Sequence, residues 1–267
     1  MSLEHSESTR PVAFNLPSTP GREDPIYKPA IEPCSDPKHS AAFIFNHGLA
    51  DSAAAIENVA DQFQQGGRLP WMSWILPNAK FNHINMDTAW FIPNGLPALA
   101  PSRPELVAEE DETGMLESVA YLESVIDAVV ATGIPPRRIV LGGFSQGCAM
   151  SLLTHLTSSK YSGKLAGIVG LLGFLPLSDS NSQRIPSLRE SAGLPRTVEG
   201  VPMFLARGTK DEFVPKRVWE YSLKAVQDLG VQEGDLEVRE YPIRHTINGA
   251  VLQDVCFWLE KVVPSLT

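Results

Sequence analysis

The chain has 267 residues, of which 43% are hydrophobic and 20% are charged, and its formal net charge is −9 at pH 7. A chain of this length and composition can bury one large core. The negative charge provides no electrostatic footprint for nucleic acid, and no stretch approaches the length of a membrane span, so we expect neither kind of partner. Three cysteines are an odd number in a chain that does not need disulfide bonds, and the first residues lack the pattern of a signal peptide. These features predict a cytoplasmic protein.

The predicted elements alternate between strands and helices along the chain. Residues 1–24 are polar and rich in Ser, Glu and Pro, which predicts an N-terminal arm with little order ahead of a single domain over residues 25–267. In chain order, the apolar periodicity predicts a strand from residue 41, a helix over 56–63, a helix over 110–130, strands over 137–141, 165–172 and 201–206, a helix over 215–229, a strand over 236–241 and a helix over 247–263.

A serine between two glycines follows the apolar run at residues 137–141. Gly143, Ser145 and Gly147 form the pattern G-x-S-x-G, and the residues after Ser145 favour a helix. In a nucleophile elbow, a sharp turn from strand to helix holds the serine in a strained backbone conformation, so only very small residues fit on either side. The pattern therefore predicts Ser145 as a nucleophile at the edge of a sheet.

The acid and the base of such a site come later in the chain, each on a loop after a strand. Asp211 lies in the turn after the strand predicted over 201–206, and His245 lies four residues beyond the strand predicted over 236–241. An imidazole can take the proton of a serine hydroxyl, and a buried carboxylate fixes the imidazole and stabilises its charged form. The order Ser145, Asp211, His245 therefore predicts a catalytic triad.

Two other carboxylates compete with Asp211 for the role of the acid. If Asp211 points toward the site, its neighbour Glu212 points to the other side of the turn. Asp235 precedes its predicted strand instead of following one. We therefore favour Asp211.

The other half of the site is expected at residues 41–52, where a continuous apolar strand runs into His47 and Gly48. In the hydrolase fold this turn carries the second donor for an oxyanion. The expected oxyanion hole consists of the backbone N–H groups of Leu49 and Gln146. We interpret His47 as a structural side chain hydrogen-bonded beneath the loop, not as a base.

Two segments show neither helix nor strand periodicity. Residues 81–106 are apolar but repeatedly broken by proline and glycine, and a long loop of this kind is uncommon unless it forms a lid or lines a binding groove. We expect Trp90 and Phe91 in this segment to contact the substrate; the alternative is that the loop packs over the edge of the sheet. Residues 178–200 are polar and form either a rim of the site or an insertion.

Six motifs in order carry a family resemblance: residues 46–51 (NHGLAD), 76–79 (LPNA), 85–91 (NMDTAWF), 143–147 (GFSQG), 173–177 (GFLPL) and 211–215 (DEFVP). Over about residues 30–264 the chain resembles the acyl-protein thioesterases and lysophospholipase-like carboxylesterases. The resemblance implies an α/β-hydrolase fold with a mostly parallel central sheet, helices on both faces and a short lid loop. It also makes Ser145, Asp211 and His245 the triad, and Leu49 and Gln146 the oxyanion pair.

The sequence departs from the pattern of that family at several positions near the site. Cys148 and Ala50 stand where the family usually has glycine, Ile92 where it has an acidic residue and Arg207 where it has histidine, and residues 241–245 lack the usual glycine before the base. All three triad residues are present. We interpret Cys148 as a small apolar packing residue.

The leading hypothesis is a serine carboxylesterase or thioesterase that works through an acyl-enzyme intermediate, with no metal and no organic cofactor. Its substrate would be an ester or thioester with an apolar acyl group, which includes an acylated protein or a lysophospholipid. Two alternatives remain open: a carboxylesterase of small molecules with short acyl chains, and a non-catalytic receptor built on the hydrolase fold. The oligomeric state is not determined by the sequence.

Overall fold

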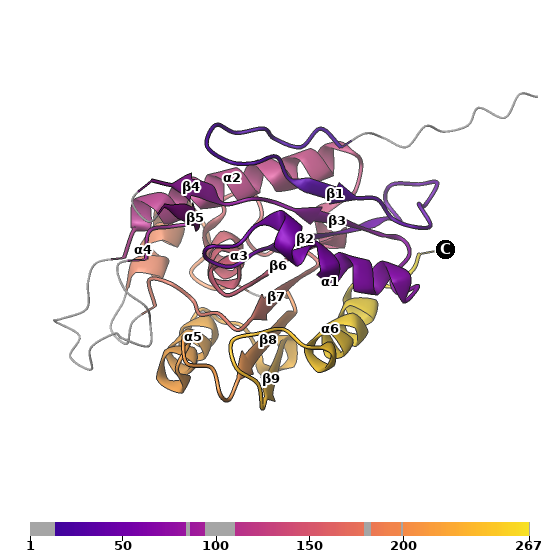
Figure 1. Ribbon diagram of the computed structural model, residues 1–267. Helices are drawn as coiled ribbons and strands as arrows, with labels where there is room; N and C mark the ends of the chain where they lie inside the picture. The colour runs from indigo at the N-terminus through magenta and orange to yellow at the C-terminus, as the bar shows by residue number, and fades with distance from the viewer. Residues whose placement is uncertain (1–13, 84–85, 94–109, 179–182, 199, 267) are drawn as a thin grey trace, which may run out of the picture.

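The computed structural model describes residues 14–83, 86–93, 110–178, 183–198 and 200–266 (Figure 1). These residues build a seven-stranded sheet in the order β1-β3-β2-β6-β7-β8-β9, in which β1 is antiparallel to β3 and every other pair is parallel. The strands are β1 (Ile26–Lys28), β2 (Ala41–Asn46), β3 (Met72–Leu76), β6 (Ile139–Phe144), β7 (Gly167–Leu171), β8 (Met203–Gly208) and β9 (Leu236–Tyr241). The predicted α/β architecture is confirmed.

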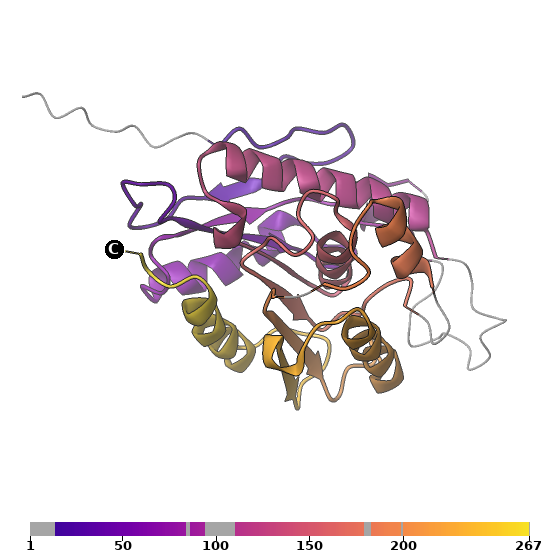
Figure 2. The ribbon, with the colours of Figure 1, turned by 180° about the vertical axis from the view of Figure 1, so that it is seen from behind.

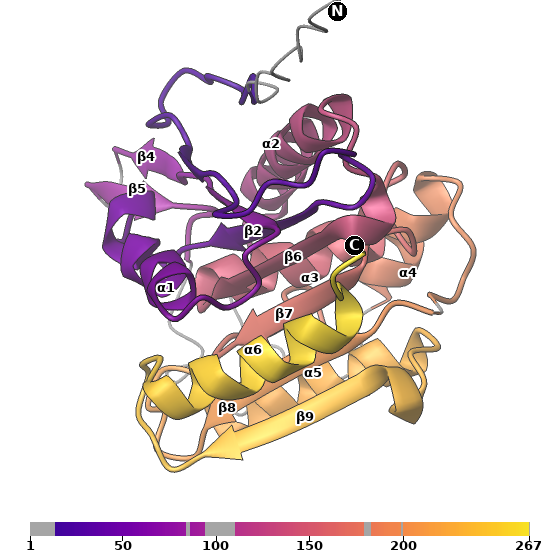
Figure 3. The ribbon, with the colours of Figure 1, turned by 90° about the vertical axis from the view of Figure 1, so that its right-hand side faces the viewer.

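Helices cover both faces of the sheet. The helices are α1 (Ala53–Gln65), α2 (Glu112–Ala131), α3 (Gln146–Thr157), α4 (Arg184–Ser191), α5 (Lys216–Asp228) and α6 (Gly249–Val262), with short 3-10 turns η3 (Pro136–Arg138) and η4 (Glu233–Asp235). In Figure 3, which looks onto one face of the sheet, α6 lies in front of the strands and α5 behind them. On one face α1 and α6 pack against the sheet, and on the other α2, α3 and α5 do so, with α4 at the rim (Figure 2).

The central strands are buried on both faces because helices lie on each side. In β2, Ala42 and Ile44 belong to the core beneath α2 and α3, whereas Phe43 and Phe45 belong to the core beneath α1 and α6. This double burial explains the continuous apolar runs of the sequence, since a parallel strand covered on both faces needs no polar side. The carboxyl ends of the parallel strands share one edge, where the loops of the site gather.

A small antiparallel hairpin, β4 (Lys80–Asn82) with β5 (Asp87–Ala89), lies beside the main sheet. The segment before β1 continues this pairing. The backbones of Arg22 and Lys80 form an isolated antiparallel β-bridge, and the Phe81 N–H donates to the Gly21 carbonyl at 2.9 Å. The ring centroids of Phe14 and Tyr27 lie 4.2 Å apart. Residues 14–24 of the expected arm therefore contact the domain, and residues 1–13 lie outside the described residues.

Several predicted boundaries need correction. The strand expected from residue 137 begins at Ile139, because residues 136–138 form η3. The helix expected over 110–130 begins at Glu112, and in its first turns Met115 is buried whereas Leu116 is 36% exposed. The segment 178–200, expected to lack regular structure, contains α4, and the buried Arg189 of this helix donates to the carbonyls of Leu156, Pro195 and Thr197. Through these bonds Arg189 attaches α4 to backbone carbonyls outside the helix, while Ile185 packs in the core.

The structure predicts that His155 makes the protein sensitive to acid. His155 of α3 is fully buried, both of its ring nitrogens lack a partner among the described residues, and burial followed by the charge of Arg189 lowers its pKa from 6.5 to about 3. Below about pH 6.5, His155 binds a proton in the unfolded chain but stays neutral in the folded chain. The free energy of unfolding therefore decreases as the pH falls. The loss begins near the unfolded pKa of 6.5, so at about 1.4 kcal/mol per pH unit over about 1.5 units it reaches about 2 kcal/mol at pH 5.

Urea unfolding of the wild type, His155→Leu and the exposed-site control His39→Leu at pH 7 and pH 5 measures this effect. We expect His155→Leu to lose about 2 kcal/mol less than the wild type on acidification, and His39→Leu to behave like the wild type. Equal losses in all three proteins would contradict the assignment.

Candidate active site

Ser145 occupies the turn between β6 and α3 in a backbone conformation that side-chain-bearing residues rarely adopt, with φ 56° and ψ −119°. The residues two positions before and after Ser145 must be glycine. A Cβ on Gly143 would lie 2.6 Å from the Gly147 carbonyl oxygen, and a Cβ on Gly147 would lie 2.5 Å from the His47 carbonyl oxygen. The Ser145 N–H donates to the Leu171 carbonyl at 2.9 Å. The close packing of these backbones explains both glycines of the predicted elbow.

The three predicted triad residues meet at the carboxyl edge of the sheet. The Ser145 hydroxyl oxygen lies 2.8 Å from His245 Nε2, and His245 Nδ1 lies 2.8 Å from Asp211 Oδ2. The Asp211 side chain is 1% exposed, and its Oδ1 accepts the N–H groups of Phe213 at 2.8 Å and Val214 at 3.0 Å. These bonds orient the carboxylate so that its second oxygen faces the imidazole. The arrangement can transfer a proton from the hydroxyl to Nε2.

The competing carboxylates face elsewhere. Glu212 is half exposed and forms an ion pair with Arg244 at 3.3 Å. Asp235 belongs to η4, just before β9, at the opposite end of the strands from the site. Of the three acids, Asp211 is the one bonded to the histidine.

Backbone contacts fix the loop of His245 without the glycine that the family usually has there. The N–H groups of Thr209 and Lys210 donate to the carbonyls of Tyr241 at 2.7 Å and Ile243 at 3.0 Å. The imidazole lies between two aromatic rings, with its centroid 4.8 Å from that of Phe144 and 5.1 Å from that of Phe213. The backbone hydrogen bonds hold the loop, and the two ring contacts hold the imidazole.

Arg207, which stands where the family usually has histidine, forms an ion pair between neighbouring strands. Its Nε donates to Glu240 Oε1 at 2.8 Å, and this guanidinium lowers the pKa of Glu240. The two residues are paired in register on β8 and β9. The substitution therefore acts beside the histidine loop and leaves the triad contacts intact.

The expected oxyanion donors lie on the two backbones next to Ser145. Gln146 is the first residue of α3, where helix N–H groups have no acceptor within the helix. Leu49 follows Gly48, and a Cβ added to Gly48 would lie 3.3 Å from the Ser145 Cβ. The loop of Leu49 therefore passes directly against the elbow. Ala50 has a φ of 58°, and its N–H donates to the Thr88 carbonyl at 2.9 Å, which anchors the loop to β5.

His47 lies beneath this loop, as the sequence predicts. It is fully buried, its Nε2 accepts the N–H of Ala79 at 2.9 Å, and its Nδ1 lies 2.7 Å from the carbonyl of Gly48. Burial lowers the pKa of His47, which keeps the ring neutral, with Nδ1 as the donor and Nε2 as the acceptor. Its role is to fix the loop.

The expectation that Trp90 and Phe91 line a substrate groove does not agree with their burial. Trp90 is 2% exposed and Phe91 7% exposed, and both belong to the core on the α2 and α3 side. The Trp90 indole N–H donates to the His47 carbonyl at 2.9 Å. These two side chains therefore pack in the core beneath the site. Residues 94–106 of this expected loop lie outside the described residues.

Sequence reasoning missed the function of the Gln146 side chain. Gln146 Oε1 accepts the Trp90 N–H at 2.9 Å, and its Nε2 donates to the Phe91 carbonyl at 2.9 Å. An amide side chain matches the two backbone groups of an extended segment, and the pair holds the first residue of α3 against residues 90–91. The neighbouring residue Cys148 is fully buried against Gly173, and burial raises its pKa to about 12, so its predicted packing role is confirmed.

Comparison with known proteins agrees with this geometry. The model of the phospholipase/carboxylesterase family matches residues 28–263. The chain belongs to this family. It is 32% identical to acyl-protein thioesterase 1 of Emericella nidulans over 245 residues, which cover 90% of this chain and 96% of that protein. It is 33% identical to acyl-protein thioesterase 1 of Yarrowia lipolytica, over 87% of this chain and 96% of that protein.

Solved structures share the architecture of this esterase family member. The crystal structure of SOBER1 from Arabidopsis thaliana aligns with a TM-score of 0.68 and 27% identity, covering 84% of this chain and 99% of that one. Acyl-protein thioesterase 2 from Zea mays has the same fold at 22% identity, with a TM-score of 0.67 over 90% of this chain and 98% of that one. Within the described ranges, no helix combines the length and hydropathy needed to cross a membrane.

The contacts of Asp211 predict a strong asymmetry between two neighbouring acids. Asp211→Asn should lower kcat by about 10³- to 10⁴-fold, because an amide cannot fix the imidazole tautomer or stabilise its charged form. Glu212→Gln removes only an exposed ion pair and should stay within about twofold of the wild type. Steady-state hydrolysis of a nitrophenyl ester by both variants tests this, and equal losses would contradict the assignment of Asp211.

The burial of Trp90 predicts that its substitution acts on every substrate alike. Trp90→Phe keeps most of the buried ring but removes the donor to the His47 carbonyl, so kcat should fall by the same factor, about tenfold, for acetyl and octanoyl esters. Measuring kcat/KM over a series of acyl lengths checks this. A change in chain-length preference would instead restore the groove hypothesis for this residue.

Proposed function

We propose that the protein hydrolyses thioesters or carboxylic esters with an apolar acyl group, through an acyl-enzyme on Ser145. The observation that carries this proposal is the continuous hydrogen-bonded chain from Ser145 through His245 to Asp211, with both distances at 2.8 Å. A receptor without turnover would not need this chain of bonds, nor the strained backbone of Ser145. Both features support an enzyme.

The proposed reaction uses side chains and backbone groups of the chain itself. His245 Nε2 takes the hydroxyl proton as Ser145 Oγ attacks the carbonyl carbon of the ester or thioester. The N–H groups of Leu49 and Gln146 stabilise the tetrahedral oxyanion, and the imidazolium returns its proton to the departing alcohol or thiol. Water then repeats the sequence on the acyl-enzyme and releases the carboxylic acid. The Asp211 carboxylate orients the imidazole and stabilises the imidazolium.

Relatives favour an acylated protein as the substrate. Two proteins named acyl-protein thioesterase 1 align with nearly their whole length, so we propose the acyl thioester of a modified protein as the principal substrate class, with lysophospholipids as a further candidate. Phe213 supports an apolar acyl group, because its ring lies against His245 and is 45% exposed. Three unpaired cysteines favour a reducing compartment, and we propose a cytoplasmic location.

One observation favours a second candidate, a carboxylesterase of short acyl chains. Trp90 and Phe91, the apolar residues expected to hold a long chain, are buried in the core. A series of acyl lengths separates the two functions, because each buried methylene contributes about 0.8 kcal/mol, or roughly fourfold in kcat/KM. A rise from acetyl to octanoyl supports the long-chain thioesterase, and a maximum at acetyl or propionyl supports the alternative.

Ser145→Ala provides the decisive test of the proposed reaction. The variant should lose at least about 10⁴-fold in hydrolysis of acyl thioesters and nitrophenyl esters, because the triad acts as a unit, and it should no longer react with a fluorophosphonate. Mass spectrometry of the labelled wild type should find one adduct, on Ser145. An adduct on another serine, or hydrolysis that persists in the variant, would contradict the proposal.

A further inference from the structure

Arg22 extends from the segment before β1 into the layer beneath the active-site loops. This residue lies outside the range 28–263 matched by the family. Its Nη1 donates to the Asn78 carbonyl at 3.2 Å and its Nη2 to the Ser118 hydroxyl at 3.2 Å. The guanidinium carbon lies 4.2 Å from the centroid of the Tyr121 ring and 5.5 Å from that of Trp90. Arg22 thus contacts three neighbours of the site and Trp90 itself.

Trp90 connects these contacts to both oxyanion elements. The Ser118 hydroxyl that accepts from Arg22 donates to the Trp90 carbonyl at 2.5 Å. The Trp90 N–H donates to the side chain of Gln146, and its indole N–H donates to the carbonyl of His47, both at 2.9 Å. One residue therefore holds the start of α3 and the start of the 47–49 loop. Arg22 contacts the ring of Trp90 directly and its backbone carbonyl through the Ser118 hydroxyl.

The charge of Arg22 is balanced by rings and neutral oxygens more than by a carboxylate. The acid that acts on it, Glu117, is 60% exposed and also lies 3.6 Å from Lys80. Burial lowers the pKa of Arg22, but a guanidinium remains charged in proteins. Burial raises the pKa of Tyr121 to about 12, so its ring stays neutral beside the cation. The contact is therefore a cation–π interaction combined with two directed hydrogen bonds.

We propose that Arg22 is a positioning residue for the oxyanion donors, acting through Trp90 on Gln146 and on the loop of Leu49. The proposal rests on the proposed function, since it concerns the same reaction. Oxyanion donors act on the charge that develops in the transition state and must hold their positions to within about 0.5 Å. Loosening Trp90 therefore lowers kcat and leaves KM nearly unchanged. The segment before β1 thereby becomes part of the machinery of the site.

Arg22→Met and Arg22→Lys test this inference in the full-length protein. Methionine keeps an apolar stem but removes the donors and the charge, and we expect kcat to fall by about tenfold with KM within about twofold. Lysine keeps a cation over the rings but cannot span Asn78 and Ser118 as a planar fork does, so it should recover part of the loss.

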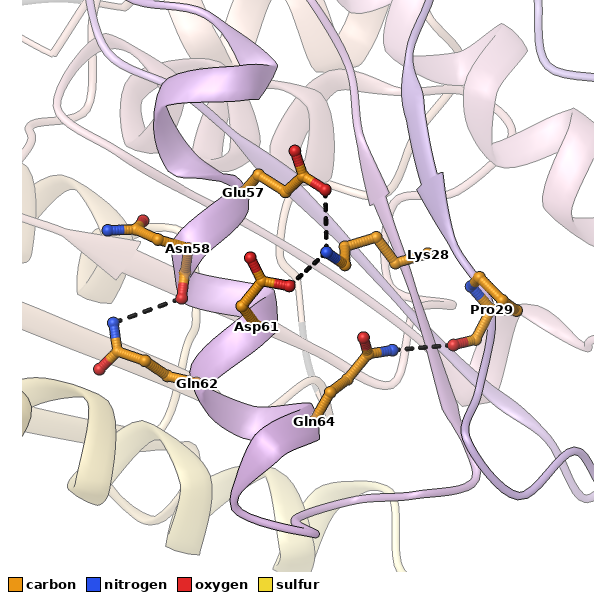
Figure 4. Close-up of polar contacts among 7 residues, drawn as sticks. All are labelled: Lys28, Pro29, Glu57, Asn58, Asp61, Gln62 and Gln64. Carbon is orange, nitrogen blue, oxygen red and sulfur yellow. Dashed lines mark hydrogen bonds and ion pairs between the residues drawn. The ribbon is translucent and has the colours of Figure 1, made fainter.

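Lys28→Met is the matched control. Lys28 comes from β1, close to Arg22 in the sequence, and its ammonium pairs with Glu57 and Asp61 of α1 (Figure 4). The substitution removes a cation that attaches the N-terminal segment to α1. Lys28, Glu57 and Asp61 form none of the hydrogen bonds of Trp90 described above. We expect its kcat to match that of the wild type.

Two readouts separate positioning from general destabilisation. A boronic acid forms a tetrahedral adduct with the serine whose oxygen occupies the oxyanion position, so its Kd should rise in Arg22→Met by the factor by which kcat/KM falls. The rate of fluorophosphonate labelling at Ser145 should fall in parallel. Urea midpoints of all variants show whether the stability losses of Arg22→Met and Lys28→Met are comparable.

The outcomes distinguish this inference from the proposed function. If the wild type is labelled at Ser145 but hydrolyses none of the esters and thioesters, the proposed function fails, and the labelling ratio still tests Arg22. The inference is overturned if Lys28→Met and Arg22→Met lose kcat equally, or if the loss appears in KM with an unchanged boronic acid Kd. If Arg22→Met does not fold, the same comparison is made with Arg22→Lys.

Discussion

The backbone of Ser145 is the constraint on which the site depends. A φ of 56° with a ψ of −119° costs roughly 1–3 kcal/mol and persists only where the surroundings over-determine it. Here β2, β6 and β7 do so: the Ser145 N–H is bonded to Leu171, and the two glycines of the elbow lie against the carbonyls that follow β2. The turn directs the hydroxyl toward the end of β9, where His245 can reach it. The remaining loops are arranged around this fixed point.

A neutral, hydrogen-bonded layer beneath the loops supplies the rigidity that an oxyanion hole requires. His47, Trp90, Ser118 and the side chain of Gln146 form it, and each donates or accepts a bond to a backbone group of its neighbours. Buried polar networks of this kind are costly when incomplete, and here the bonds connect Gln146 with His47, which precedes the proposed donor Leu49 by two residues. Donors held in this way need no reorganisation when negative charge develops.

Three of the positions at which the sequence departs from the pattern of similar proteins make local contacts that leave the triad intact. Arg207 pairs with Glu240 on the adjacent strand, and Cys148 fills the space between α3 and Gly173. The histidine loop lacks a glycine but is held by the N–H groups of Thr209 and Lys210. Arg22, which lies ahead of the matched residues 28–263, adds a hydrogen bond to Ser118. The hydrogen bonds from Ser145 to His245 and from His245 to Asp211 are kept beside these residues.

The sequence by itself determined the alternating strands and helices, the elbow at Ser145 and the order of Asp211 and His245, because these follow from local periodicity and from steric rules that act over a few residues. It could not determine the burial of Trp90, the helix α4 or the contacts of Arg22. Trp90 lies in a segment without periodicity. Arg189 attaches α4 to the domain by donating to the Leu156 carbonyl, and Arg22 donates to Ser118, which lies 96 positions further along the chain. Contacts between residues so far apart leave no local pattern, so only the packed tertiary structure decided them.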